Sequence, residues 1–360
     1  MSRNILEVSR ENFFKNVDSV RKKVGNSVEI MPIVKANGYG SYINRDIDVM
    51  NRFKIVGVAR VLEAIDLRKR GYNGDIFVLN QPFIDEIDDI CSYNLVVGVS
   101  SIEFLEEVVK TNKNIRIHIE VETGMGRTGV SDKDFSMFLD YVSSNNNILV
   151  EGIYTHLSSS DIDHDFTMKQ IDLFNNKVFA VKEVFPNIKY IHMAASNAIL
   201  NYDLGLCNMI RPGIILYGYP SSKSCLGKID LFPVLKLKSK ISFIKDVYPG
   251  DSIGYGRSFV ADRQLKVATI GIGYADGVRR ALGNKGYVSI KGKKCRIIGN
   301  VCMDSIMVDV SLIDDVRISD DVYLFDNNIV DVLEIANICN TINYEIISSI
   351  GERVDRVFVD

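Results

Sequence analysis

The chain has 360 residues, of which 46% are hydrophobic and 25% are charged, and its formal net charge is -3. This composition supports an extensive core, argues against wholesale disorder, and offers no basic surface of the kind that binds nucleic acid. The amino-terminal residues lack the apolar segment of a signal peptide, and no stretch is apolar enough to span a membrane. The length fits a barrel of about 250 residues with a smaller module.

The 6 cysteines are scattered without a CxxC pair, and the 4 histidines are dispersed. Such spacing argues against a disulfide framework and against a zinc site. We therefore expect a cytoplasmic protein with reduced thiols and no metal ion. We also expect no nucleic-acid partner and no membrane attachment.

Strand-like and helix-like segments alternate over the first two-thirds of the chain. The expected strands are residues 30–36, 55–59, 75–79, 95–99, 115–122, 149–156, 190–195 and 209–217. The expected helices are residues 10–24, 61–70, 102–110, 132–144 and 165–184, with Ser101 and Ser131 as amino-terminal caps. Eight strands with crossover helices predict a closed (β/α)8 barrel of the TIM type. An open doubly wound sheet is the competing fold, but no GxGxxG follows its first strand.

The pattern changes after residue 229. Residues 234–243 alternate apolar and polar side chains, as a half-buried strand does. Further expected strands are residues 267–272, 287–290, 295–298, 306–310 and 322–324, with one helix at 330–339. We therefore predict a barrel domain over residues 9–228 and a β-rich carboxyl-terminal domain over residues 229–360, with which residues 1–8 could pair.

The apolar run of residues 30–34 predicts a buried strand that places Lys35 at its carboxyl end, before a turn at residues 37–40. Burial lowers the pKa of a lysine. A partly neutral amine is what a Schiff base with an aldehyde cofactor requires. On this stretch alone, a surface lysine that simply ends a strand is an equal alternative.

Further polar side chains follow other expected strands, on the rim where barrel enzymes place their catalytic groups. They are Tyr39 after the first strand, Glu120, Glu122 and Arg127 around the fifth, His156 after the sixth, Ser196 after the seventh, and Arg211 with Gly213 and Ile214 on the eighth. The seventh and eighth strands are the usual phosphate site of this architecture. A phosphate site beside a Schiff-base lysine predicts pyridoxal 5'-phosphate as the cofactor.

Six motifs together resemble the alanine racemase family, which combines a pyridoxal-phosphate-binding barrel with a β-rich carboxyl-terminal domain. They are VKANGYG at 34–40, ETGMGRTG at 122–129, IRPGI at 210–214, GYGR at 254–257, GIGYADG at 271–277 and VCMD at 301–304. Each motif alone is a modest indication, but they occur in family order over almost the whole chain. The resemblance implies an isomerase that interconverts L- and D-alanine.

The resemblance also implies a role for each site residue. Lys35 would hold the cofactor and act as one catalytic base, and Tyr255 would be the other. Tyr39, Ser196, Gly213 and Ile214 would bind the cofactor phosphate. Arg211 would donate to the pyridine nitrogen with His156 behind it, Leu79 would lie near the ring, and Arg127 would reach cofactor and substrate. Tyr255, Tyr274 and Met303 would enter from the partner subunit of a homodimer.

Several of these residues also have ordinary structural explanations. Tyr255 could be a hairpin aromatic, His156 a strand-end histidine, and Arg211 a buried ion-pair partner. His118 and His164 are expected to be structural or solvent-facing, and we interpret His192 as structural. The constellation, rather than any one member, favours the functional interpretation.

The sequence departs from the family pattern at three places. Ser41 and Tyr42 stand where His-Gly is usual, and Glu120 stands where some members carry a carbamylated lysine. We expect the Glu120 carboxylate to hold Arg127 in place. Glu352 stands where many members place a phosphate-binding tyrosine, so it either turns away or the pocket is rebuilt.

The favoured function is alanine racemisation for peptidoglycan precursor supply. Racemisation of serine or another small amino acid is the first alternative, because the pocket-lining changes could admit a different side chain. A non-catalytic pyridoxal-phosphate-binding protein is less favoured, because related single-domain barrels lack a domain that carries residues 254–256. A decarboxylase on a similar scaffold is more remote still.

Overall fold

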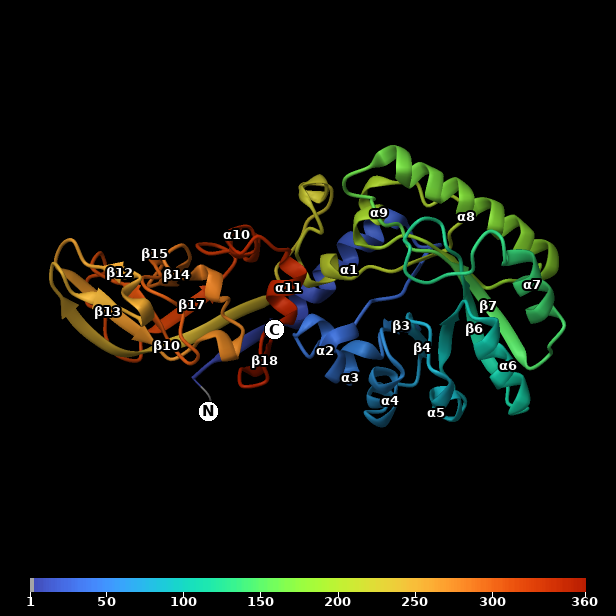
Figure 1. Cartoon of the computed structure of the whole chain (residues 1–360), viewed down its shortest axis with the longest axis horizontal. Helices are drawn as coiled ribbons and strands as arrows, with labels where there is room; N and C mark the ends of the chain where they lie inside the picture. The colour runs from blue at the N-terminus through green and yellow to red at the C-terminus, as the bar shows by residue number, and fades with distance from the viewer. Residues whose placement is uncertain (1–2) are drawn as a thin grey trace. The chain divides into compact units, whose positions relative to one another are not determined.

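The computed structural model describes residues 3–360. The chain forms two compact units (Figure 1). The barrel unit contains residues 14–38 and 43–231, and the β unit contains the segment that ends at Phe13, residues 39–42 and residues 232–360. No helix among the described residues is long and apolar enough to cross a membrane.

The barrel unit is built on parallel strands with helices outside them (Figure 1). A 6-stranded sheet runs in the order β3 (Ile55–Val58), β4 (Asp75–Val78), β5 (Val96–Val99), β6 (Ile115–Glu120), β7 (Ile148–Tyr154) and β8 (Tyr190–His192). A 2-stranded sheet pairs β2 (Glu29–Ile30) with β9 (Met209–Ile210). Parallel bridges from Ile33 to Gly57 and from Ala195 to Arg211 join the two sheets at both edges. The ring therefore closes, and the predicted (β/α)8 barrel is confirmed.

The first and eighth strands are shorter than the sequence predicts. After β2 the chain turns at Lys35–Tyr39, labelled α2, where residues 36–38 have left-handed dihedral angles. After β9 it forms the 3-10 helix η3 at Ile214–Tyr217. The predictions of strands at residues 30–36 and 209–217 were therefore wrong beyond their first residues, because an apolar run is equally compatible with a buried turn or helix.

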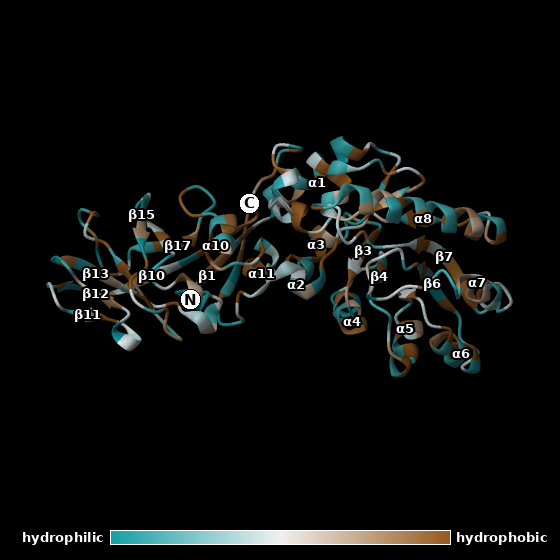
Figure 2. Ribbon diagram, turned by 45° about the horizontal axis from the view of Figure 1, so that its top comes forward, coloured by the Kyte–Doolittle hydropathy of each residue, from teal (hydrophilic) through white to brown (hydrophobic). Residues whose placement is uncertain are grey.

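The other helices of the barrel unit are α1 (Arg10–Val24), α3 (Ile47–Met50), α4 (Val61–Lys69), α5 (Ile87–Ser92), α6 (Ile102–Lys110), α7 (Phe135–Ser143), α8 (His164–Val184) and α9 (Ser196–Asn201). The five predicted helices are present as α1, α4, α6, α7 and α8, whereas α3, α5 and α9 were not anticipated. The predicted cap is present at Ser101, whose Oγ accepts from the Phe104 N–H at 3.1 Å. Ser131 Oγ instead accepts from the Asp134 N–H at 3.2 Å and closes a turn, so α7 begins after the expected position. Hydrophilic and hydrophobic residues alternate along α8, as an outer helix requires (Figure 2).

The barrel interior contains aromatic and imidazole rings that pack beside glycines. The even strands β4, β6 and β8 contribute Phe77, His118 and His192, and the Phe77 and His118 rings stack with centroids 4.6 Å apart. The odd strands β5 and β7 contribute Gly98 and Gly152, and β7 also contributes the Tyr154 ring, which stacks on the His192 ring with centroids 5.1 Å apart. A Cβ at Gly98 would lie 2.1 Å from the Tyr154 hydroxyl, and one at Gly152 would lie 2.7 Å from the His118 ring. Glycine at these positions is therefore what leaves room for the rings, an arrangement in keeping with the layered packing of such barrels.

The β unit is organised on an 8-stranded sheet in the order β15-β14-β17-β10-β1-β18, with β13 paired to β10 and to β16. Its strands are β1 (Ile5–Ser9), β10 (Leu235–Val247), β13 (Leu265–Ile270), β14 (Tyr287–Ile290), β15 (Lys293–Arg296), β16 (Ile306–Asp309), β17 (Asp321–Phe325) and β18 (Asp355–Val359). A separate hairpin joins β11 (Ser252–Ile253) to β12 (Phe259–Val260). The helices are α10 (Val332–Ile338) and α11 (Asn343–Ser348). The predicted β-rich domain is confirmed, whereas β18 and α11 were not anticipated.

Candidate active site

Lys35 lies at the carboxyl end of the first barrel strand, directly before a tight left-handed turn. The φ angles of Ala36, Asn37 and Gly38 are 53°, 55° and 61°, and that of Tyr39 is 55°. Burial lowers the pKa of Lys35, nearby Arg127 and Arg211 lower it further, and the Glu63 carboxylate opposes them. Lys35 therefore holds an amine that loses its proton more readily than an exposed lysine does.

Arg211 is buried at the same end of the barrel, with an exposed fraction of 2%. Its Nη1 donates to His192 Nδ1 at 2.7 Å and to the His192 carbonyl at 3.0 Å. Its Nη2 donates to the carbonyls of Thr155 at 2.7 Å and Met193 at 3.1 Å. Burial lowers the pKa of Arg211 to about 10, so it stays protonated at neutral pH. Its Nε–H makes no hydrogen bond to any residue between 3 and 360, so one fixed donor remains for a ligand.

A chain of two buried imidazoles continues from Arg211 into the barrel. Arginine has no acceptor, so His192 Nδ1 must accept and the His192 proton must lie on Nε2. That Nε2 lies 2.8 Å from His118 Nδ1, so His118 carries its proton on Nε2, which has no partner among the described residues. Burial lowers the pKa of both histidines, which keeps both neutral. The sequence analysis predicts only a structural role for His192, and the occurrence of two histidines in otherwise apolar strands is the signal that could have indicated this hydrogen-bonded chain.

His156 lies on the other side of the Arg211 guanidinium. Its Nδ1 is 3.4 Å from Arg211 Nη2, which makes Nδ1 an acceptor and leaves the proton on Nε2. Burial and the neighbouring cations lower the pKa of His156 to about 3. His156 is therefore neutral near pH 7 and offers Nε2–H as a donor.

Glu120 and Arg127 lie near each other. Glu120 Oε1 accepts from Thr128 Oγ1 at 2.9 Å, and burial raises the Glu120 pKa. No ion pair joins Glu120 to Arg127 within residues 3–360, although Arg127 is near enough to lower the Glu120 pKa. The two side chains do not pair directly, and the expectation that the Glu120 charge holds Arg127 in place stays a prediction. Glu122 instead shapes the loop that carries Arg127, because its Oε2 accepts from the Gly126 N–H at 2.8 Å.

The predicted phosphate-binding residues of the barrel unit lie where β8 and β9 end. Ser196 is buried at the start of α9, and its Oγ accepts from the Gly213 N–H at 3.0 Å. Ile214 is the first residue of η3, so its N–H has no acceptor within that helix. Leu79 is partly exposed just after β4, and its carbonyl accepts from the Tyr154 hydroxyl at 2.8 Å. These groups provide a hydroxyl and helix-start N–H donors, which suit an anion.

Three predicted residues lie in the β unit on neighbouring loops. Tyr255, Tyr274 and Met303 are exposed, with exposed fractions of 73%, 44% and 52%. The Asn300 side chain donates to the Tyr255 carbonyl at 2.7 Å, and the Tyr274 N–H donates to the Cys302 carbonyl at 3.0 Å. The loop of residues 300–303 thus ties together the segments that present these side chains.

Two further predicted positions also belong to the β unit. Tyr39 is buried with its ring 6.0 Å from that of Tyr344, and burial raises its pKa. Glu352 is exposed, and its carboxylate makes no hydrogen bond or ion pair with a residue that the structure describes. The next residue, Arg353, pairs instead with Asp304 at 2.7 Å. Of the two alternatives for Glu352, the exposed side chain agrees with one that turns away.

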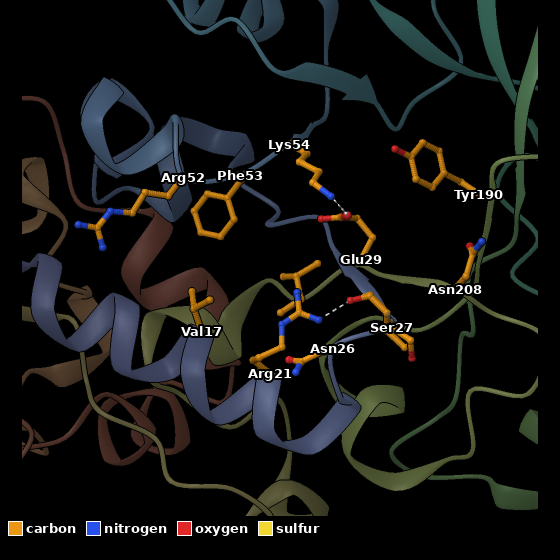
Figure 3. Close-up of a pocket in the computed structure, with 12 residues that line it drawn as sticks. Val17, Arg21, Asn26, Ser27, Glu29, Arg52, Phe53, Lys54, Tyr190 and Asn208 are labelled. Carbon is orange, nitrogen blue, oxygen red and sulfur yellow. Dashed lines mark hydrogen bonds and ion pairs between the residues drawn. The ribbon is translucent and has the colours of Figure 1, made fainter.

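A separate cavity of about 540 Å³ lies at the opposite, amino-terminal ends of the barrel strands (Figure 3). Its charged groups are engaged within the protein: Lys54 pairs with Glu29 at 3.5 Å, and Arg21 donates to the Gly25 carbonyl at 2.8 Å. The Asn208 side chain accepts from the Ile191 N–H at 2.9 Å. This cavity is therefore distinct from the rim that carries Lys35.

The donor set at the rim fits pyridoxal phosphate. A lysine with a lowered pKa suits the aldehyde, a spare guanidinium N–H suits the pyridine nitrogen, and a hydroxyl with helix-start N–H groups suits the phosphate. No group of metal-ligating side chains occurs in the described part of the chain. Fold and site together define the barrel class of pyridoxal-phosphate enzymes.

Comparison with known proteins identifies the family. Residues 8–221 match the alanine racemase amino-terminal domain, and residues 234–358 match the alanine racemase carboxyl-terminal domain. The alanine racemase of Halothermothrix orenii is 36% identical over 356 residues, which is 95% of this chain and 93% of that protein. The chain belongs to the alanine racemase family, a family of pyridoxal-phosphate-dependent isomerases, and the resemblance found in the motifs is confirmed.

Solved structures agree with this assignment. The alanine racemase of Bacillus anthracis, solved with bound L-Ala-P, superposes with a TM-score of 0.93 at 29% identity and covers 100% of this chain and 96% of its own. That of Bartonella henselae, solved with covalently bound pyridoxal phosphate, has a TM-score of 0.90 at 26% identity and covers 100% of both chains.

Proposed function

We propose that this chain interconverts L- and D-alanine with pyridoxal phosphate and two bases, Lys35 and the partner subunit's Tyr255. The observation that carries the proposal is a lysine of lowered pKa on the same barrel rim as a buried, permanently protonated arginine. The alanine racemase relatives and the neighbour with bound L-Ala-P support the choice of substrate.

When bound, pyridoxal phosphate withdraws electrons from the substrate and makes its α-proton acidic. Lys35 would take or return that proton on one face, because its lowered pKa leaves part of the amine neutral. Tyr255 would do the same on the opposite face. A tyrosine with a pKa of about 10 is a poor base, so the Nε2–H of His156 would stabilise its phenolate.

Arg211 would donate Nε–H to the pyridine nitrogen without giving up the proton, because its pKa of about 10 lies far above that of a pyridine. Four N–H bonds to fixed acceptors hold the guanidinium in place for this task. An arginine there keeps the ring a weak electron acceptor, and this limits side reactions such as transamination.

The remaining predicted residues have binding roles in this proposal. Tyr39, Ser196, Gly213 and Ile214 would bind the phosphate, and Leu79 would lie against the ring. Arg127, Tyr274 and Met303 would bind the substrate. The domain boundary at residues 228 and 229 also stays a prediction, close to the division before Phe232.

We propose that the working form is a homodimer with shared active sites. Tyr255 and Met303 expose more than half of their surface and lie on neighbouring loops, so both are accessible to a partner subunit. A cytoplasmic enzyme that supplies D-alanine for peptidoglycan fits the six unpaired cysteines, since thiols stay reduced in that compartment.

Serine is the second candidate substrate, because Glu352 leaves the family's phosphate-binding tyrosine position without a phenol. A chiral assay with the cofactor supplied decides between the two amino acids. We expect D-alanine from L-alanine, with a kcat/KM well above that for L-serine. Equal or faster turnover of L-serine would contradict the assignment, and no turnover of any small L-amino acid would overturn racemisation.

A further inference from the structure

Glu63, on α4 outside the predicted site, accepts hydrogen bonds from two segments of the barrel rim. Its Oε2 accepts from the N–H groups of Ala59 at 2.8 Å and Arg60 at 3.1 Å. Its Oε1 accepts from the Ala36 N–H at 2.6 Å. The first pair is the usual way in which a glutamate in the first turn caps its own helix. The bond to Ala36 serves no purpose in α4, so it requires a different explanation.

The Ala36 peptide is the one that directly follows Lys35. Ala36, Asn37 and Gly38 adopt left-handed angles one after another, a run that L-residues disfavour because Cβ crowds the following carbonyl. Such conformations persist only where the surroundings fix them. The Gly38 N–H donates to the Val34 carbonyl at 2.9 Å, and Arg45 Nη2 donates weakly to Asn37 Oδ1 at 3.5 Å. The Glu63 carboxylate, which comes from α4, holds the first peptide of the turn by accepting from the Ala36 N–H.

Glu63 also acts on Lys35 through its charge. The groups that face the Lys35 amine are Arg127 and Arg211, which are cationic, His156, which is neutral, and Glu63. Burial and both arginines lower the Lys35 pKa, and Glu63 is the carboxylate that raises it. Without Glu63 the amine would lose its proton at a lower pH.

We infer that Glu63 is a positioning residue for Lys35, and that its carboxylate holds the left-handed turn which aims the amine. The inference rests on the proposed function, in which Lys35 must release the cofactor, handle the α-proton and then bind the cofactor again. The lysine side chain moves in this cycle, so its backbone anchor has to stay fixed. The hydrogen bond from the Ala36 N–H to Glu63 connects that backbone to α4.

The test compares Glu63→Gln with Glu86→Gln. Glu86 is a matched control, because it accepts from the Phe83 N–H at 2.9 Å in the same capping position but makes no bond near Lys35. A glutamine has one acceptor oxygen, so it cannot serve Ala36 and the α4 cap together. We expect Glu63→Gln to lower kcat for alanine about tenfold with a smaller change in KM, as loss of a charge-assisted hydrogen bond implies.

Two measurements do not depend on turnover. Hydrogen exchange at the Ala36 amide in the cofactor-free protein should speed up in Glu63→Gln and not in Glu86→Gln. The pH profile for formation of the visible cofactor band should move to lower pH in Glu63→Gln alone. Glu63→Asp separates the hydrogen bond to Ala36 from the charge that acts on Lys35, because it keeps the carboxylate but is one methylene shorter. The Ala36 amide should then exchange faster, while the pH profile should stay unchanged.

The inference is overturned if Glu63→Gln and Glu86→Gln give the same Ala36 exchange and the same pH profile. It is also overturned if the Ala36 amide exchanges as slowly in Glu63→Asp as it does in the unmodified chain. If the unmodified chain fails to racemise alanine, the proposed function fails. The exchange and cofactor-band measurements then still decide whether Glu63 positions Lys35.

Discussion

Replacing Gly98 by alanine tests whether the barrel interior depends on the alternation of glycines and rings. The added Cβ would lie 2.1 Å from the Tyr154 hydroxyl and 2.9 Å from Tyr154 Cζ, both too close for real contacts, and a tight 3.1 Å from the Leu79 carbonyl. Overpacking of this kind costs about 2 kcal/mol. Displacing Tyr154 also weakens its 2.8 Å hydrogen bond to the Leu79 carbonyl, which adds about 1 kcal/mol. We therefore expect the barrel to lose about 3 kcal/mol of unfolding free energy.

The assay is thermal unfolding of the cofactor-free chain, followed by circular dichroism. A loss of about 3 kcal/mol corresponds to a fall in Tm of roughly 6–12 °C for a unit of this size. Gly271→Ala is the control, because a Cβ there meets no atom within 4 Å. Adding Tyr154→Phe to Gly98→Ala removes the atom at 2.1 Å, so the double variant should cost less than the sum of the single changes. Strict additivity, or a Tm unchanged by Gly98→Ala, would refute the packing argument.

Four further predictions concern the site. Lys35→Ala should abolish the visible absorption band that cofactor binding produces, and an unchanged spectrum would remove Lys35 from that role. Tyr255→Phe should keep the band but lose racemisation by about a hundredfold or more, seen in the chiral assay. Mixing these two inactive variants should restore some activity through hybrid dimers; no restoration despite demonstrated subunit exchange would exclude shared sites. Finally, burial holds the pKa of His118 and His156 at about 3 and that of His192 well below its usual value. The unfolded chain therefore binds more protons below about pH 6.5, so unfolding free energy should fall as pH drops from there towards 3, and a flat urea-midpoint profile over this range would contradict the neutral assignment.

The sequence predicted the parts of the fold that depend on local patterns. The central strands and the helices at residues 10–24 and 102–110 were found because their apolar periodicity is strong and their length is fixed by neighbouring turns. Lys35, Arg211 and His156 were placed on one rim because strand ends meet there in any barrel. β18 was missed because it pairs with β1, at the other end of the chain, and no local pattern reports such a partner.

The features of the site that escaped prediction are those made by long-range contacts. The Arg211–His192–His118 chain joins three strands, and its tautomers follow from geometry alone. A turn was predicted at residues 37–40, but its left-handed angles include three residues other than glycine, Ala36, Asn37 and Tyr39, and composition gave no reason to expect those angles. Glu120 Oε1 accepts from the Thr128 hydroxyl, a contact that no spacing in the sequence indicates.

The strand order of the β unit has a consequence for how the protein is made. β1 lies between β10 and β18, antiparallel to the first and parallel to the second, with Ile5 opposite Lys238 and Asp355. During synthesis β1 must therefore wait for β10 and β18, which leave the ribosome only after every strand of the barrel. Both edges of β1 are open to wrong partners until β10 emerges, and the edge that pairs with β18 stays open longer. The charged residues Arg3, Glu7 and Arg10 within and beside β1 would discourage such pairing during this interval.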